Sequence, residues 1–269
     1  MPGYIKSKSL TAGGKTMAYL EFGRGEKTLL ILPGIGDGLR TVRGLSTPLT
    51  TLYRTYAKHC RVVVLSRPNE LISGTTTRAM AEDVRRALDV LHIDKVWLMG
   101  VSQGGMVAQY LALDHPERVE KLILVSTLAR PNAALRTVVT HWMAMQRHGD
   151  ERGILLDIAE RSYSPAYLKH RRAVYHLTGL FTRPQDSARF VALAESCLTH
   201  DTYARLPELT CPTFIVAGSE DHIVGPICAR ELAHQIPGSQ CAIYLGLGHG
   251  VYDEAPDFHA RTLAFLEKQ

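Results

Sequence analysis

The sequence predicts an α/β fold in which a mostly parallel, doubly wound sheet carries an inserted helical lid. Short apolar segments of strand length alternate with helical segments in the first half of the chain. This alternation stops at residue 128 and resumes at residue 208, and the interval has helical periodicity only. The pattern therefore predicts a core domain of residues 1–127 and 208–269 and a lid of residues 128–207.

Composition limits the possible classes of protein. A chain of 269 residues with 45% hydrophobic side chains can bury the core of one large α/β domain with an insertion. No apolar run could span a bilayer, and the first residues lack the apolar segment of a secretory signal, so we expect a cytoplasmic protein without a membrane partner. The net charge of +5 is spread along the chain, which gives no support for nucleic acid binding. The five cysteines are scattered without a C-x-x-C pair and indicate reduced thiols.

The elements follow in order from these patterns. Residues 4–10 and 16–22 alternate around a Gly-Gly turn and predict an antiparallel hairpin. Continuous apolar runs of the kind buried in parallel sheets predict strands at 28–32, 61–66, 95–100, 121–126, 212–217 and 240–245. Helical patterns between them predict helices at 45–58, 77–91, 106–113, 226–235 and 256–267. The lid is predicted to contain helices at 133–148, 153–161, 165–177 and 185–200.

The stretch around Ser102 is typical of a sharp strand-to-helix turn. Gly100 and Gly104 stand two residues before and after the serine, and glycine lets the strand and the helix pass closely. The turn pushes the hydroxyl out of the sheet edge, so Ser102 is the predicted nucleophile. Gln103 follows at the helix start, and its N–H is a predicted oxyanion donor.

A glycine-rich loop follows the predicted strand 28–32. The loop, residues 33–38, lacks the Gly-Lys-Ser/Thr and G-x-G-x-x-G spacings of phosphate-binding loops. It suits a second oxyanion donor better, and we assign this role to the N–H of Ile35. The alternative is a tight connection with no further role.

Asp221 and His249 complete a predicted catalytic triad with Ser102. Each follows one of the last two strands, and catalytic groups in open α/β sheets gather at the carboxyl ends of strands. His249 would take the hydroxyl proton, and Asp221 would orient the imidazole. Glu220 is the alternative acid. No histidine shows metal-ligand spacing, so neither a metal nor another cofactor is expected.

Large apolar side chains in the lid are candidates for a substrate pocket, although most should pack within the lid itself. We predict that Gly34, Trp142 and Val224 bind substrate. The sequence does not show which other lid residues face the pocket.

With these residues in place, the whole chain resembles the α/β-hydrolase superfamily. It is most similar to small cytosolic hydrolases, which include enol-lactonases, carboxylesterases and C–C bond hydrolases. The matching stretches are Gly100–Gly105, Asp114–Val119, Gly218–Asp221 with Ile223-Val224, and Gly248-His249 with Glu254-Ala255-Pro256. The resemblance implies the α/β-hydrolase fold, with the triad in the order serine, acid, histidine.

Two stretches depart from the family pattern. Pro33 stands where the family commonly has a histidine, and residues 66–70 replace the usual Asp and glycine-rich turn. Arg40, Arg43 and Arg67 flank these loops. We expect them to be solvated, and the alternative hypothesis is that one of them binds an anionic group of the substrate.

The predicted function is hydrolysis of a carboxylic ester, lactone or thioester of a small to medium acyl group through an acyl-enzyme. C–C bond hydrolysis, perhydrolysis and acyl transfer use the same triad and stay open. A ligand sensor of this fold, which signals through the lid without turnover, is the alternative of another class. The predicted partner is a small-molecule acyl substrate, and a homodimer is possible.

Overall fold

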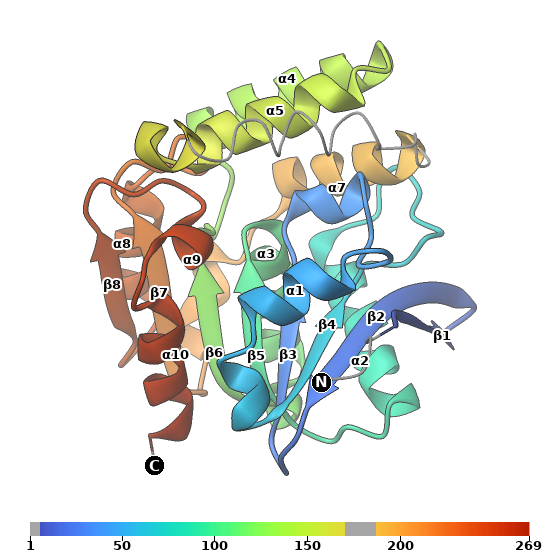
Figure 1. The fold of residues 1–269 in the computed structure, drawn as a ribbon, viewed down its shortest axis with the longest axis vertical. Coiled ribbons are helices and arrows are strands. Elements are labelled where there is room, and N and C mark those ends of the chain that lie inside the picture. Colours follow the sequence, from blue (N-terminus) through green and yellow to red (C-terminus); the bar gives the residue numbers. More distant parts are fainter. Residues whose placement is uncertain (1–5, 170–186, 269) are drawn as a thin grey trace.

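One sheet organises the molecule. The computed structural model describes residues 6–169 and 187–268, and within them the sheet has eight strands in the order β1-β2-β4-β3-β5-β6-β7-β8 (Figure 1). The strands are β1 (Lys8–Ala12), β2 (Lys15–Gly23), β3 (Thr28–Leu32), β4 (Arg61–Leu65), β5 (Val96–Val101), β6 (Val119–Val125), β7 (Thr213–Gly218) and β8 (Gln240–Tyr244). The β1–β2 and β2–β4 pairs are antiparallel and the other pairs are parallel. The α/β fold class and the mostly parallel sheet are therefore confirmed.

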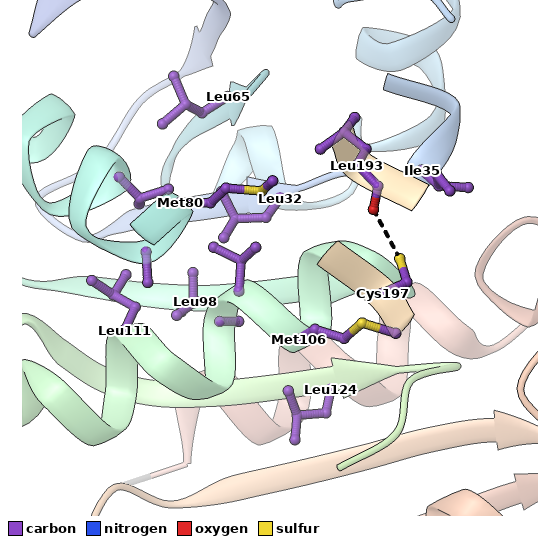
Figure 2. Packing of buried hydrophobic residues seen from close by; sticks show 14 of the residues in the cluster. Leu32, Ile35, Leu65, Met80, Leu98, Met106, Leu111, Leu124, Leu193 and Cys197 are labelled. Carbon is purple, nitrogen blue, oxygen red and sulfur yellow. Dashed lines mark hydrogen bonds between the residues drawn. The ribbon is translucent and has the colours of Figure 1, made fainter. Parts of the chain in front are cut away.

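The central strands are buried on both faces. Alternate residues of each strand point to opposite faces, so Leu98 of β5 joins one core cluster and Met99 joins the other. The first cluster lies against α2 (Thr77–Val90), α3 (Gln103–Asp114) and α8 (Ile227–Gln235), and Figure 2 shows Met80 of α2 and Leu111 of α3 near Leu98. The second cluster is covered by α1 (Ser46–Leu52) and α10 (Phe258–Glu267). This two-sided burial explains why the strands read as continuous apolar runs.

Two predicted helices have different bounds in the structure. The segment predicted as one helix at 45–58 forms α1 and then a 3₁₀ turn, Tyr56–Lys58, and the interruption lets the rings of Tyr53 and Tyr56 both pack against His259. The predicted last helix starts at Phe258 instead of Pro256, and a short helix, α9 (Val251–Glu254), precedes it. Ala255 is extended because the following proline disfavours helical backbone there.

Helices α4 (Ala133–Arg147), α5 (Glu151–Ser162) and α7 (Ser187–Thr199) lie between β6 and β7, and residues 165–169, the described start of the helix predicted at 165–177, are helical as well. Helices α4 and α5 lie across the carboxyl ends of the parallel strands, and α7 lies beneath them, next to the 3₁₀ turn Ile35–Gly38 (Figure 1). The predicted helix 165–177 lies outside the described residues from residue 170 onward, as do the first two residues of the helix predicted at 185–200.

Within the described residues, each helix is too short or too polar to be a membrane span.

Candidate active site

Ser102 occupies a strained turn between β5 and α3. Its backbone has φ 53° and ψ −121°, a conformation that costs free energy for a residue with a side chain. The flanking glycines are required by close packing, since a Cβ at Gly104 would lie 2.1 Å from the carbonyl oxygen of Leu32 and one at Gly100 would lie 2.5 Å from the carbonyl oxygen of Gly104. The strand-to-helix turn predicted from the glycine spacing is therefore present.

The imidazole of His249 is held by Asp221. The Nδ1 atom lies 2.7 Å from Asp221 Oδ2, and both side chains are buried. The other carboxylate oxygen accepts the N–H groups of Ile223 and Val224 at 2.9 and 3.0 Å. Burial alone would raise the pKa of the Asp221 carboxyl, but the His249 ring and these N–H groups outweigh it and lower the pKa below its usual value.

This hydrogen bond determines which ring nitrogen can act as a base. An ionised carboxylate only accepts hydrogen bonds, so Nδ1 of His249 carries the proton that is donated to Asp221. The Nε2 atom then has a free lone pair and can take a proton from a neighbouring hydroxyl.

The predicted oxyanion donors flank the serine from two sides. Gln103 is the first residue of α3 and Ile35 is the first residue of its 3₁₀ turn, so neither N–H has a partner within its own helix. The loop that carries Ile35 packs tightly against the serine, because a Cβ at Gly34 would lie 3.2 Å from Ser102 Cβ and 3.7 Å from Ser102 Oγ. The two predicted donors therefore belong to separate elements that both adjoin Ser102.

These groups open onto one cavity of about 450 Å³. Ser102, His249, Gly34 and Ile35 line its floor, together with Val101 and Ile223. The remaining walls are largely apolar: Val42, Leu45, Pro48 and Leu49 lie between β3 and β4, and Trp142, Leu155 and Ile158 belong to α4 and α5. The indole N–H of Trp142 donates to Asp157 Oδ2 at 2.7 Å, which fixes the ring in the cavity wall. The cavity volume lies in the range of small-molecule sites.

The structure brings most of the sequence-predicted site residues together. Ser102 and His249 line the same cavity, although among the described residues no hydrogen bond joins the two side chains; such bonds are often long in ligand-free enzymes. Of the predicted substrate-binding residues, Gly34 and Trp142 line the cavity, whereas Val224 is buried in the core and Ile223 takes its place. The alternative acid, Glu220, is exposed.

The loop that carries His249 also contacts the end of α5. The N–H of Gly250 donates to the carbonyl oxygen of Ser162, at the end of α5, at 2.7 Å. A Cβ at Gly250 would lie 2.3 Å from the ring of Tyr163, and one at Gly248 would lie 2.6 Å from the Ser162 oxygen. The glycines on either side of His249 therefore make room for this contact.

The expectation that three arginines near these loops are solvated is wrong for one of them. Arg40 and Arg43 are exposed, and Arg40 lines the cavity. Arg67 is 1% exposed and lies between the Ile35 loop and the start of α3. A further buried arginine, Arg189 of α7, pairs with Asp37 of the Ile35 loop at 2.6 Å. Sequence reasoning missed this ion pair, because residues 152 positions apart give no periodic signal.

Comparison with known proteins agrees with this architecture. A family model described as alpha/beta hydrolase fold matches residues 27–256. The chain is 30% identical over 215 residues to the putative carbamate hydrolase RutD of Caulobacter vibrioides, which covers 74% of this chain and 75% of that protein.

Two further similarities differ in what they cover. The chain is 29% identical over 266 residues to polyketide synthase ThaQ of Burkholderia thailandensis, which covers 95% of this chain, but the chain spans only 12% of the length of that protein. The enol-lactonase of Burkholderia xenovorans superposes with a TM-score of 0.85 over 97% of this chain and 100% of that one, at 20% identity, which is a likeness of fold.

Proposed function

This chain belongs to the alpha/beta hydrolase family, and on that premise we propose that it is a serine hydrolase that cleaves a carboxylic ester, lactone or thioester through an acyl-enzyme on Ser102. The observation that carries this proposal is a strained serine on the same cavity as a histidine whose tautomer is set by a buried carboxylate. Seen together, these groups form the constellation that nucleophilic acyl transfer needs.

The mechanism follows from the positions of these groups. Ser102 Oγ attacks the substrate carbonyl carbon while His249 Nε2 takes the hydroxyl proton. The carbonyl π electrons move to the oxygen, and the N–H groups of Ile35 and Gln103 stabilise the resulting negative charge. Collapse of this intermediate breaks the bond to the leaving group, which receives the proton from His249. A water molecule then repeats the sequence on the acyl-enzyme and releases the carboxylic acid.

The cavity supports an apolar acyl group of small to medium size. Its walls are mainly valine, leucine, isoleucine, proline and tryptophan side chains, and the polar residues Arg40, Ser162 and Tyr252 also line it. Helices α4 and α5 lie across the strand ends (Figure 1) and contribute Trp142, Leu155 and Ile158 to the cavity wall, so these helices would act as the lid that excludes water from the acyl group.

A carbamate is the second candidate substrate. The relative from Caulobacter vibrioides is named a putative carbamate hydrolase and shares 30% identity with this chain. A carbamate carbonyl undergoes the same attack by serine, so the proposed residues would keep their roles. The cavity walls then determine whether an ester or a carbamate is cleaved. Both substrate classes should therefore be measured in the same assay.

A panel of p-nitrophenyl esters of increasing acyl length, with a p-nitrophenyl carbamate, tests the proposal on the wild-type protein and on Ser102→Ala. We expect multiple turnovers by the wild type and a loss of at least about 10³-fold in kcat for the variant. Labelling by a fluorophosphonate should map to Ser102 by mass spectrometry. Equal hydrolysis by both proteins would refute the assigned nucleophile, and at most one slow turnover with tight ligand binding would favour a sensor.

A further inference from the structure

Arg67 lies behind the proposed oxyanion hole with its guanidinium out of contact with solvent. It lies two residues after the end of β4, and it is 1% exposed. An arginine is seldom this buried without a carboxylate partner, since removing its charge from water costs folding free energy. The contacts that hold it therefore need an explanation.

The guanidinium donates hydrogen bonds to both elements that carry the proposed oxyanion donors. Its Nε and Nη2 atoms donate to the side-chain oxygen Oε1 of Gln103 at 3.1 and 2.6 Å. Its Nη2 also donates to the carbonyl oxygen of Pro33, the residue before Gly34 and Ile35. One planar group thus joins the start of α3 to the loop after β3, the two elements that carry the proposed donors.

The side-chain amide of Gln103 is fixed on its other side as well. Its Nε2 atom donates to Ser196 Oγ and lies 3.2 Å from the sulfur of Met80. With both ends of the amide bound, the residue that offers its backbone N–H to the substrate cannot rotate freely, and its side chain is fully buried. Arg67 is the charged member of this set of contacts.

The groups that accept hydrogen bonds from the Arg67 side chain, Gln103 Oε1 and the Pro33 carbonyl oxygen, are both neutral. The nearby carboxylate of Asp37 pairs with Arg189 at 2.6 Å and accepts the backbone N–H of Arg67, not its side chain, at 2.9 Å. Among the described residues, Nη1 of Arg67 has no hydrogen-bond partner. Burial lowers the pKa of Arg67 to about 10, so it is still a cation at neutral pH. A buried cation in this position gains a counter-charge when an oxyanion forms beside Gln103 and Ile35.

We propose that Arg67 is a positioning residue. It fixes the backbone N–H groups of Ile35 and Gln103 relative to each other and supplies positive charge behind them. The inference rests on the proposed function, because it concerns the same site. A fork of guanidinium donors fits this role and a lysine does not, since an ammonium cannot bond to Gln103 and Pro33 in one plane. Arg67 would stabilise the negative charge of the tetrahedral intermediate and not the bound ester. Replacing it should therefore lower kcat and leave the binding of the ester unchanged.

The test compares Arg67→Met, Arg67→Lys and Arg43→Met. Arg43 is an exposed arginine on the neighbouring loop whose guanidinium contacts Ser9 Oγ at 2.7 Å, and its variant serves as the matched control. For the best p-nitrophenyl ester, we expect kcat of Arg67→Met to fall by about 10²-fold with KM within about twofold. Arg67→Lys should fall by about tenfold, and Arg43→Met should match the wild type.

The second readout is binding of an alkyl trifluoromethyl ketone against the corresponding secondary alcohol. Ser102 Oγ adds to the ketone carbon, the π electrons move to the oxygen, and the hydroxyl proton passes to His249, so the ketone reports the oxyanion while the alcohol reports the cavity alone. We expect Arg67→Met to lose ketone affinity in proportion to kcat/KM and to keep alcohol affinity. Gln103→Met, which removes the acceptor of Arg67 and keeps the backbone N–H, should show the same pattern even if Arg67→Met fails to fold.

The possible outcomes are distinguishable. Equal losses of ketone and alcohol affinity, or a kcat for folded Arg67 variants equal to that of Arg43→Met, would overturn the role of Arg67 and leave the serine hydrolase intact. A wild-type protein that neither hydrolyses the esters nor forms the ketone adduct would overturn both proposals.

Discussion

Replacing Asp221 by asparagine should remove most of the catalysis without removing the fold. In the wild type, Oδ1 accepts the N–H groups of Ile223 and Val224, and Oδ2 accepts the Nδ1 proton of His249 at 2.7 Å. Asparagine has one oxygen, and facing its NH₂ group toward two backbone donors would leave both N–H groups unsatisfied. The side chain should therefore keep its oxygen on the backbone and turn its NH₂ group toward His249.

This orientation reverses the hydrogen bond at the imidazole. Nδ1 must then accept, so the ring proton moves to Nε2, and Nε2 can no longer take the proton of Ser102. The expected loss is about 10⁴-fold in kcat, the magnitude typical of a wrong histidine tautomer in a serine triad. At about 1.4 kcal/mol for each tenfold step, this is a rise of roughly 5 kcal/mol in the activation free energy.

The assay is steady-state hydrolysis of a p-nitrophenyl ester, with circular dichroism to show that the variant is folded. Glu220→Gln is the matched control, since it makes the same change of charge one residue away on an exposed side chain. We expect its kcat/KM to stay within about twofold of the wild type. A folded Asp221→Asn protein within tenfold of wild-type kcat, or an equal loss in Glu220→Gln, would refute the reasoning.

Three further predictions concern stability and specificity. Burial lowers the pKa of His200 to about 3, so between pH 7 and 5 the unfolded chain takes up a proton that the folded chain does not. The free energy of unfolding should then fall by about 2 kcal/mol through this residue, and denaturant titrations of His200→Gln should lose that much less than the wild type over the same interval. A Cβ at Gly104 would lie 2.1 Å from the carbonyl oxygen of Leu32, so Gly104→Ala should lose about 3 kcal/mol of unfolding free energy, and an unchanged thermal midpoint would contradict the packing argument. Arg40 is exposed at the cavity, so Arg40→Glu should raise KM about tenfold for esters with an anionic acyl group. The KM of Arg40→Glu for neutral esters should equal that of the wild type, and Arg43→Glu should change the KM for neither kind of ester. If Arg40→Glu and the wild type have equal KM values for anionic esters, Arg40 does not bind the anionic group.

The fold was predictable from the sequence because the features that specify it are local. The apolar runs of β3 to β7 have a length and continuity that only a strand covered on both faces explains, and the structure confirms the parallel sheet. The turn at Ser102 was predictable for a similar reason. Gly100 and Gly104 are required because a Cβ at either position would clash with backbone a few residues away or on the neighbouring strand. Their spacing in the sequence therefore predicts the turn.

Helix ends were less predictable. The interruption of the segment 45–58 depends on two tyrosine rings that pack against His259, and that residue belongs to the other end of the chain. Helical propensity does not contain this information, because the contact forms only when the tertiary structure brings the two segments together.

The sequence by itself determined the order of strands and helices and the placement of a serine, an acid and a histidine after successive strands, because these follow from periodicity and from the geometry of the parallel sheet. Only the tertiary structure decided which acid faces His249, that Ile223 and not Val224 lines the cavity, and that Arg67 is buried beside Gln103. Side-chain direction and burial depend on neighbours that are distant in the chain. From sequence alone, a charged side chain is therefore predicted to be exposed. Only the tertiary structure shows the hydrogen-bond partners that stabilise it in the interior.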